Sequence, residues 1–173
     1  MSITLTTERL QLRPAREDDV DALARILAHP DVAKWWPDYD AVRVRAEFVA
    51  PQDDVTVLAI EHEGTPIGVV QFGEETDPQY RHASIDLFID SAHHRRGFGP
   101  EVIRAVVTHL LDACGHHRIV IDPAAENTRA IRAYEKVGFR GVGLMRESER
   151  GPDGTWHDGL LMELLAREFV REA

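Results

Sequence analysis

Residues 127–139 read Asn-Thr-Arg-Ala-Ile-Arg-Ala-Tyr-Glu-Lys-Val-Gly-Phe. Within this stretch Ala130, Ile131 and Tyr134 recur at the spacing of a single helix face, so the pattern predicts an amphipathic helix. A lone aromatic residue at helical spacing usually packs in the core, and core packing is the simplest interpretation of Tyr134. A functional interpretation of this tyrosine needs support from another part of the chain.

Both ends of the predicted helix carry residues that helix ends favour. The side-chain oxygen of Asn127 can accept a backbone N–H of the first turn. Gly138 suits the left-handed conformation that ends many helices. Just upstream, the apolar residues 118–121 predict a short strand that stops at Asp122 and Pro123. The region therefore predicts a strand followed by a capped helix.

The chain has 173 residues, of which 43% are hydrophobic and 29% are charged, as in a folded domain with a substantial core. We expect a single domain over residues 1–173. The sequence shows neither an N-terminal secretion signal nor an apolar run that could span a bilayer, so we expect a cytoplasmic protein with no membrane partner. The one cysteine, Cys114, falls at an apolar position of a predicted helix, which favours a buried, unreactive thiol.

Acidic residues outnumber basic ones along the chain. Thirty Asp and Glu against twenty Lys and Arg give a formal net charge of −10. Such a surface repels nucleic acids and attracts cationic partners, so we expect no nucleic-acid partner.

The nine histidines include two adjacent pairs, His93-His94 and His116-His117. Neighbouring side chains in a loop converge poorly on one ion, and neither a Cys cluster nor a His-Glu-x-x-His motif accompanies them. We therefore predict no metal site.

Hydrophobic periodicity along the rest of the chain predicts a mixture of strands and helices. The expected strands cover residues 6–13, 55–62, 67–72, 83–89, 118–121, 142–150 and 155–165. The expected helices cover residues 17–28, 40–49, 100–113, most of the stretch 127–139, and a short C-terminal helix at 167–171. No repeat or linker interrupts this order, so a single α+β domain accounts for the whole chain.

A second informative element lies between the expected strand 83–89 and the helix expected to begin at Pro100. It reads His94-Arg95-Arg96-Gly97-Phe98-Gly99. Two glycines let the backbone approach a ligand closely, and the following helix start presents unpaired N–H groups. With its two arginines, the turn predicts a pyrophosphate-binding loop. Taken alone, an exposed turn with two hydrated arginines explains it equally well.

Together the two elements resemble the acetyl-coenzyme A (acetyl-CoA) core of the Gcn5-related N-acetyltransferase (GNAT) superfamily. The match is a strand, Arg-Arg-Gly-Phe-Gly, a helix, a strand and then Asn-x-x-Ala-Ile-x-x-Tyr-Glu-Lys-x-Gly-Phe, all within residues 83–139. The resemblance implies an α+β fold with a mixed, mostly antiparallel central sheet of about six to seven strands flanked by helices. It also implies splayed strands that form an acetyl-CoA cleft, acetyl-CoA as cosubstrate, and a monomer or homodimer.

Within that superfamily the sequence is similar to the aminoglycoside 6'-N-acetyltransferases. This narrower likeness is carried by Trp35-Trp36, the acidic loop Glu74-Glu75-Thr76-Asp77-Pro78, Ile85-Asp86, and Asp122-Pro123 ahead of Asn127. Relatives that act on siderophore precursors or on protein N-termini share parts of this pattern.

Two positions depart from the pattern of the superfamily. His94 stands where a Gln or Arg usually opens the phosphate loop, and Pro100 removes one N–H from the helix start.

The resemblance implies two catalytic residues. An amine must be neutral to attack a thioester, so a cationic acceptor needs a proton acceptor, and Asp86 is the candidate. Alternatively, Asp86 is a structural carboxylate that satisfies the loose backbone of a β-bulge. Tyr134 would protonate the departing thiolate or donate a hydrogen bond to it; otherwise it is a packed core tyrosine.

The resemblance also implies residues that bind acetyl-CoA. These are Phe88, Ile89, His94, Arg95, Arg96, Gly97, Phe98, Gly99 and Asn127. The oxyanion would meet a backbone N–H near Phe88 or Ile89.

The acceptor amine would be bound by aromatic and acidic side chains. The implied residues are Trp35, Trp36, Glu75, Asp77, Asp86 and Asp122. The tryptophans would form an apolar wall and the acids would attract ammonium groups. The alternatives are core packing for the tryptophan pair and a hydrated loop for the acids.

These features predict an enzyme that moves an acetyl group from acetyl-CoA to a primary amine of a cationic small molecule. The expected acceptor is the 6'-amine of an aminoglycoside. Attack would be direct, in a ternary complex, because no cysteine is placed to form a covalent intermediate. Two alternatives stay open: the acceptor is a protein N-terminus or a siderophore-precursor amine, or the chain is a non-catalytic CoA-binding module.

Overall fold

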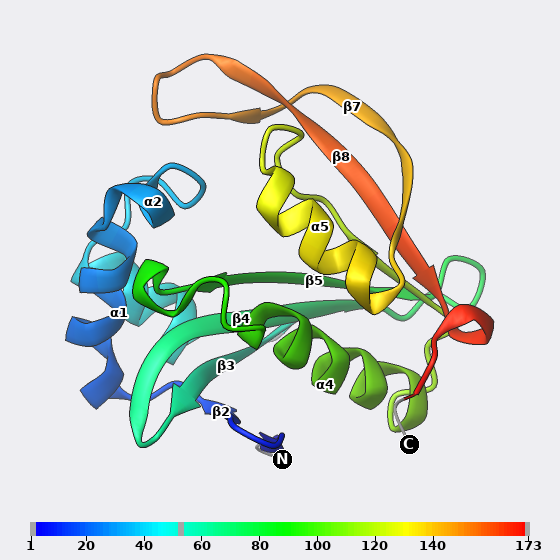
Figure 1. The fold of residues 1–173 in the computed structure, drawn as a ribbon, viewed down its shortest axis with the longest axis horizontal. Helices are drawn as coiled ribbons and strands as arrows, with labels where there is room; N and C mark the ends of the chain where they lie inside the picture. The colour runs from blue at the N-terminus through cyan, green and yellow to red at the C-terminus, as the bar shows by residue number, and fades with distance from the viewer. Residues whose placement is uncertain (1–2, 52–53, 172–173) are drawn as a thin grey trace.

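One eight-stranded sheet runs through the part of the chain that the structure describes, residues 3–51 and 54–171 (Figure 1). In this computed structural model the strand order is β1-β2-β3-β4-β5-β6-β8-β7. All neighbouring strands pair antiparallel except β5 and β6, which are parallel. The strands are β1 (Leu5–Thr6), β2 (Gln11–Pro14), β3 (Val55–His62), β4 (Thr65–Glu75), β5 (His82–Ile89), β6 (Arg118–Ile121), β7 (Arg140–Arg150) and β8 (Trp156–Leu165).

Helices cover both faces of this sheet. The helices are α1 (Val20–Ala28), α2 (Pro30–Ala33), α3 (Ala41–Val44, extended by a π-helical turn at Arg45–Val49), α4 (Phe98–Asp112) and α5 (Thr128–Val137). Short 3-10 turns lie at Glu17–Asp19, Ser91–His93 and Ala166–Glu168. Figure 1 shows the β7–β8 hairpin arching over α5. Among the described residues, no helix is both long and apolar enough to cross a membrane.

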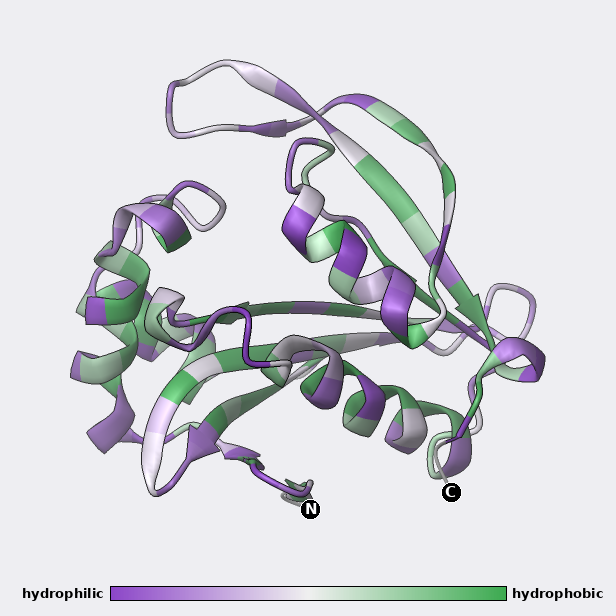
Figure 2. Cartoon of the chain, in the orientation of Figure 1, coloured by the Kyte–Doolittle hydropathy of each residue, from purple (hydrophilic) through white to green (hydrophobic). Residues whose placement is uncertain are grey.

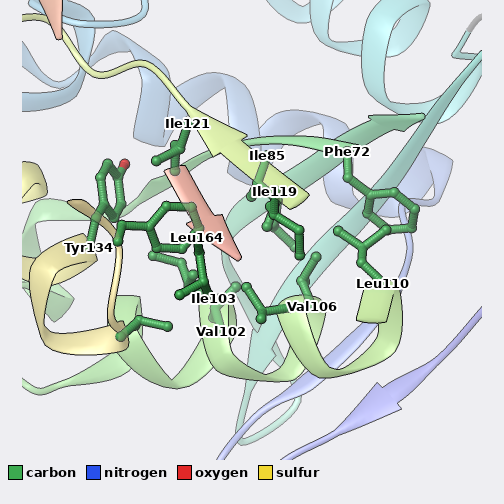
Figure 3. Close-up of a cluster of buried hydrophobic side chains, with 14 of the residues drawn as sticks. Phe72, Ile85, Val102, Ile103, Val106, Leu110, Ile119, Ile121, Tyr134 and Leu164 are labelled. Carbon is green, nitrogen blue, oxygen red and sulfur yellow. The ribbon is translucent and has the colours of Figure 1, made fainter. Parts of the chain in front are cut away.

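Side chains alternate along the central strands between two cores, one on each face of the sheet. Val70 and Ile85 belong to the core beneath α4 and α5, part of which Figure 3 shows. Val69 and Phe88 belong to the core beneath α1 and α3. Figure 2 shows that the middle of the sheet carries mostly hydrophobic residues, as burial on both faces requires.

Most predicted elements are confirmed, and the ends of α5 are confirmed in detail. Strand β6 covers the predicted residues, Arg118–Ile121. The Asn127 side chain accepts the backbone N–H of Ala130 at 3.2 Å, so it caps α5 as predicted. Gly138 has a φ of 116°, in the left-handed region that ends helices.

Two predicted elements differ in the structure. The single strand expected at residues 6–13 is instead two short strands, β1 and β2, joined by a turn. This split gives eight strands where about six to seven were expected. The helix expected at residues 167–171 is only a 3-10 turn, Ala166–Glu168. In addition, the sequence did not predict α2.

Strands β5 and β6 splay apart, as the fold prediction required. Their parallel pairing is limited to Ala83 with Ile119 and Ser84 with Val120. Beyond these pairs the strands diverge, so the second half of β5 pairs with β4, and no strand of the described part of the chain pairs with its other side. The backbone of this half is therefore open toward α5.

Candidate active site

A cavity of about 570 Å³, called the main cavity because most of the predicted site residues line it, lies where the open end of β5 faces the start of α4 and one side of α5. Many residues predicted for the site line this cavity: Trp35, Trp36, Phe88, Ile89, His94, Arg95, Gly97, Phe98, Gly99, Asn127 and Tyr134. The structure thus brings the two sequence motifs together around one space.

The N-terminus of α4 opens onto the main cavity. Gly97 precedes the helix with a φ of 80°, a conformation that favours glycine. The next two residues, Phe98 and Gly99, line the cavity, and first-turn N–H groups have no partner within their own helix. Pro100 is the third residue of α4 instead of the first, and its missing N–H still falls among these unpaired positions. This helix start suits an anion.

A row of basic side chains on α5 also lines the main cavity. It consists of Arg129, Arg132 and Lys136. Residues spaced by three and four positions share one helix face, so the sequence contained a signal for this row that the prediction passed over. Together with Arg95, the row makes the cavity wall positive.

Arg96 lies outside the lining of the main cavity, unlike its neighbour Arg95. Its guanidinium carbon stands 4.9 Å from the centre of the Phe98 ring. Arg9 stacks on the same ring at 4.5 Å and donates a hydrogen bond to the Arg96 carbonyl at 2.9 Å. In this arrangement Arg96 supports the loop.

The open edge of β5 presents backbone N–H groups toward α5. The Asp90 N–H donates a 2.7 Å hydrogen bond to the carbonyl oxygen of Ile67 in β4. Because N–H groups alternate along a strand, those of Leu87 and Ile89 face the open edge, whereas that of Phe88 faces β4. The Leu87 N–H is taken by the Asp86 carboxylate at 2.9 Å. Of the two N–H groups predicted for the oxyanion, the one on Ile89 has the suitable direction.

Asp86 lies on this open edge, where solvent reaches its side chain while the surrounding protein displaces part of its hydration. This desolvation, followed by the charge of Asp122, raises the pKa of Asp86 to about 7. The bond from Leu87 N–H lowers the pKa by less than these effects raise it, and Glu149 raises it further. The β4–β5 register is continuous here, so no bulge accounts for Asp86, although its carboxylate does satisfy one open N–H.

Asp122 and Glu149 form an acidic cluster with Asp86. Desolvation raises the pKa of Asp122. Desolvation and the charge of Asp122 raise the pKa of Glu149. The prediction included Asp122 but missed Glu149, since a glutamate in a strand far along the chain carries no local signal. The three carboxyl groups repel one another when ionised, and a bound cation would reduce this repulsion.

Tyr134 is 7% exposed and packs in the first core, so its predicted core packing is real. Its hydroxyl nevertheless makes no hydrogen bond to any residue of the described ranges, and it is not closed off from solvent. Figure 3 shows the oxygen pointing away from the packed side chains. Burial, then the charges of Asp86 and Asp122, raise the pKa of Tyr134, so the phenol stays protonated. It can therefore donate a proton into the cavity.

Residues 9–140 match the model of the acetyltransferase (GNAT) domain, which is most of the chain. The protein belongs to the GNAT acetyltransferase family. Its sequence is 30% identical over 171 residues to aminoglycoside N(6')-acetyltransferase type 1 of Klebsiella pneumoniae, covering 88% of this chain and 82% of that protein.

Solved structures show the same GNAT fold. The structure of AAC(6')-Ib in complex with paromomycin and acetyl-CoA has a TM-score of 0.75 at 27% identity, covering 93% of this chain and 96% of that one. Mycobacterium smegmatis RimJ in complex with CoA-disulfide has a TM-score of 0.80 at 26% identity, covering 99% of this chain and 90% of that one.

The two adjacent tryptophans of this GNAT acetyltransferase are half-buried and both line the main cavity. Trp36 packs its ring edge against Phe88, with centroids 5.1 Å apart, and so joins the second core. Trp35 is not among the residues packed in the second core, and the Lys34 ammonium lies 4.4 Å from the centre of its ring. Core packing therefore accounts for part of the burial of Trp36. Trp35 is the better candidate for an apolar surface that contacts a ligand.

The structure does not bring Glu75 and Asp77 to the cavity of this GNAT domain. Both are exposed: Glu75 is the last residue of β4 and Asp77 lies in the turn that follows, where the Asp77 N–H donates to the Glu75 carboxylate and the Gln79 N–H donates to the Asp77 carboxylate, each at 2.8 Å. This turn lies at the end of β5 opposite Ile89, and eight residues of strand span roughly 25 Å. The carboxylates of Glu75 and Asp77 accept backbone N–H groups of this same segment.

The structure also describes two further residues considered in the sequence analysis, Asn127 and Cys114. The Asn127 oxygen is occupied by its capping bond. Burial raises the pKa of the half-buried Cys114 thiol, which keeps it protonated. Within the described ranges, no three His, Cys, Asp or Glu side chains are grouped to hold a metal ion.

Proposed function

We propose that this GNAT acetyltransferase transfers an acetyl group from acetyl-CoA to a primary amine of a cationic small molecule, with the 6'-amine of an aminoglycoside as acceptor. The observation that carries the proposal is the acidic cluster of Asp86, Asp122 and Glu149 beside the Tyr134 hydroxyl. The identity to the aminoglycoside N(6')-acetyltransferase supports the same acceptor.

The main cavity suits the donor substrate. The unpaired N–H groups at the start of α4, with Arg95 and Arg129, complement the pyrophosphate of CoA. The open edge of β5 offers backbone groups to the amides of its pantetheine arm. Acetyl-CoA supplies a thioester carbonyl, and we assign the Ile89 N–H, on the open edge of β5, as the donor to its oxyanion.

Asp86 and Tyr134 have different roles in proton transfer: Asp86 accepts a proton from the ammonium group, and Tyr134 donates one to sulfur. An ammonium group must lose a proton before it can attack, and a carboxylate with a pKa of about 7 can accept that proton near neutral pH. As the new C–N bond forms and the C–S bond breaks, the protonated Tyr134 donates to the departing sulfur. The products are an amide and a thiol, and the second proton leaving the amine restores Tyr134. One proton is released overall.

The acceptor is tested with a matched pair of aminoglycosides. Neomycin and paromomycin differ only at the 6' position, which is an amine in neomycin and a hydroxyl in paromomycin. We expect the purified protein to release free thiol from acetyl-CoA with neomycin and not with paromomycin. Equal release with both, or release only with peptides that have a free N-terminus or with hydroxylated lysine derivatives, would refute the acceptor. No release with any amine would favour the non-catalytic module.

A further inference from the structure

His94 makes two hydrogen bonds across the main cavity. Its Nε2 lies 2.8 Å from the carbonyl oxygen of Ile89, the last residue of β5. Its Nδ1 lies 2.6 Å from Nη1 of Arg129, in the first turn of α5. One half-buried imidazole therefore connects the strand that presents the oxyanion N–H to the helix that carries the basic row.

The chemistry of the two partners determines the protonation of this ring. A guanidinium can only donate hydrogen bonds, so Nδ1 must accept the bond from Arg129. A carbonyl can only accept, so Nε2 must carry the proton that it donates to Ile89. Both bonds exist together only when His94 is the neutral Nε2–H tautomer.

The connection compensates for a local weakness of the fold. Ile89 lies in the half of β5 that has no strand on the side facing β6. Nothing in a sheet ladder restrains its peptide groups on that side, and Arg129 lies on the surface of α5. His94 supplies the lateral contact to β5 and orients Arg129 at the same time.

We infer that His94 is a positioning residue: as a neutral imidazole it holds Ile89 and Arg129 in the arrangement that binds the acetyl-CoA thioester and pyrophosphate. The inference rests on the proposed use of the main cavity for acetyl-CoA, and not on the identity of the acceptor. It replaces the direct phosphate contact that the sequence implied for this position.

The charges around the ring make this positioning sensitive to pH. Asp31 of α2 and Asp90 before the 3-10 turn face the ring as anions, and Arg129 of α5 faces it as a cation. Burial first, with Arg129, lowers the pKa of His94 below its ordinary value, although the bond to Ile89 opposes this. Protonation in acid would place a proton on Nδ1 and repel Arg129, and CoA binding should weaken as a result.

Equilibrium binding of CoA tests the inference without any acceptor. His94→Ala removes both bonds, and we expect the Kd for CoA to rise roughly tenfold at pH 7.5, about the effect of one lost hydrogen bond to a charged group. His94→Gln keeps a donor and an acceptor in one side chain, so its Kd should stay within about threefold of the parent. Thermal unfolding of each variant checks that it is folded.

The pH dependence separates positioning from simple packing. Glutamine does not titrate, so we expect the parent to lose CoA affinity below about pH 6.5 more steeply than His94→Gln does. Identical pH profiles would overturn the inference. So would a folded His94→Gln protein as weak as His94→Ala, because that result requires the imidazole itself as the ligand.

A double-mutant cycle supplies the matched control. His94→Ala and Arg129→Ala should be non-additive in CoA binding, since each breaks the same bond. Arg132 lines the same cavity from the same helix, but within the described residues the ring of His94 is hydrogen-bonded to Ile89 and Arg129 and not to Arg132, so the effects of His94→Ala and Arg132→Ala should add. Additivity in both cycles would contradict a link through Arg129. Failure of the aminoglycoside test, with these binding results intact, would leave the positioning role in place.

Discussion

At Tyr134, a buried ring carries a hydroxyl with no hydrogen-bond partner among the described residues. The Tyr134→Phe variant should therefore fold normally, with stability changed by less than about 1 kcal/mol. Turnover should fall roughly a hundredfold, the contribution expected of a general acid, while the Kd for CoA stays close to that of the parent. Steady-state kinetics with direct CoA binding check this. A variant with parental turnover would exclude Tyr134 from the mechanism.

Asp86 is the second residue whose role can be tested at this scale. With a pKa of about 7, it is a base only above neutral pH and is protonated below it. The kcat/KM of the parent should therefore rise through about pH 7. Asp86→Asn should lose that rise, with the deepest loss of activity at neutral pH and above. A variant with the pH profile of the parent would contradict the assignment.

Asp86→Asn should lower activity, but we expect it to raise the stability of the fold. A carboxyl whose folded pKa lies above its unfolded value costs stability once the pH exceeds the unfolded value, and the cost is complete above the folded value. Asparagine carries no charge and still accepts the Leu87 N–H. We expect Asp86→Asn to melt at a higher temperature than the parent at pH 8, with little difference at pH 4. A lower melting temperature at pH 8 would mean that Asp86 is structural.

At the scale of elements, a buried ion pair joins β2 to the start of α1. Arg13 and Asp19, 6% and 4% exposed, form two hydrogen bonds of 2.7 and 2.9 Å. Arg13 also bonds Glu61 of β3 at 2.7 Å. Asp19→Asn should lower the free energy of unfolding by about 3 kcal/mol at pH 7, because it leaves a buried cation with one partner fewer.

The destabilisation caused by Asp19→Asn should become smaller in acid. Burial alone would raise the pKa of Asp19, but the bonds from Arg13 and from the Arg16 N–H outweigh it, and the pKa is lowered. Its stabilisation is therefore complete above the unfolded pKa of about 4 and is lost as the pH falls through the lower folded value. Urea unfolding of parent and variant at pH 7 and pH 2.5 measures the difference. An equal gap at both pH values would mean that the charge of Asp19 does not stabilise the fold.

Elements with local signals could be predicted closely. For α5, the capping residue Asn127 and the terminal Gly138 act within a few residues of the helix they delimit. The first strand could not be predicted so well. There, Leu10 N–H donates to the Thr7 hydroxyl at 2.9 Å and closes a turn, and β1 is held by pairing with β2. An alternating apolar pattern over residues 6–13 does not reveal that turn.

At the scale of the whole molecule, the acidic cluster draws on three separate segments. Asp86 lies in β5, Asp122 follows β6 and Glu149 lies in β7. Glu149→Gln should raise the KM for a cationic aminoglycoside roughly fivefold and leave the KM for acetyl-CoA unchanged. Glu75→Gln is the matched control: it removes the same charge from the last residue of β4, beside the far end of β5, and should change neither constant. A larger effect from Glu75 than from Glu149 would contradict this placement.

The sequence by itself determined the alternation of strands and helices, the caps of α5, the basic glycine turn and the identity of Tyr134 and Asp86 as candidates. Periodicity, capping and turn chemistry act over a few residues, so one chain is enough to detect them. Only the tertiary structure decided which acids share the site, because the approach of Asp86, Asp122 and Glu149 follows from the splay of β5 and β6 and from the order β6-β8-β7. It also places Glu75 and Asp77 outside the lining of the main cavity and brings His94 into contact with Ile89 and Arg129. These contacts join residues distant in the chain, where no local pattern operates.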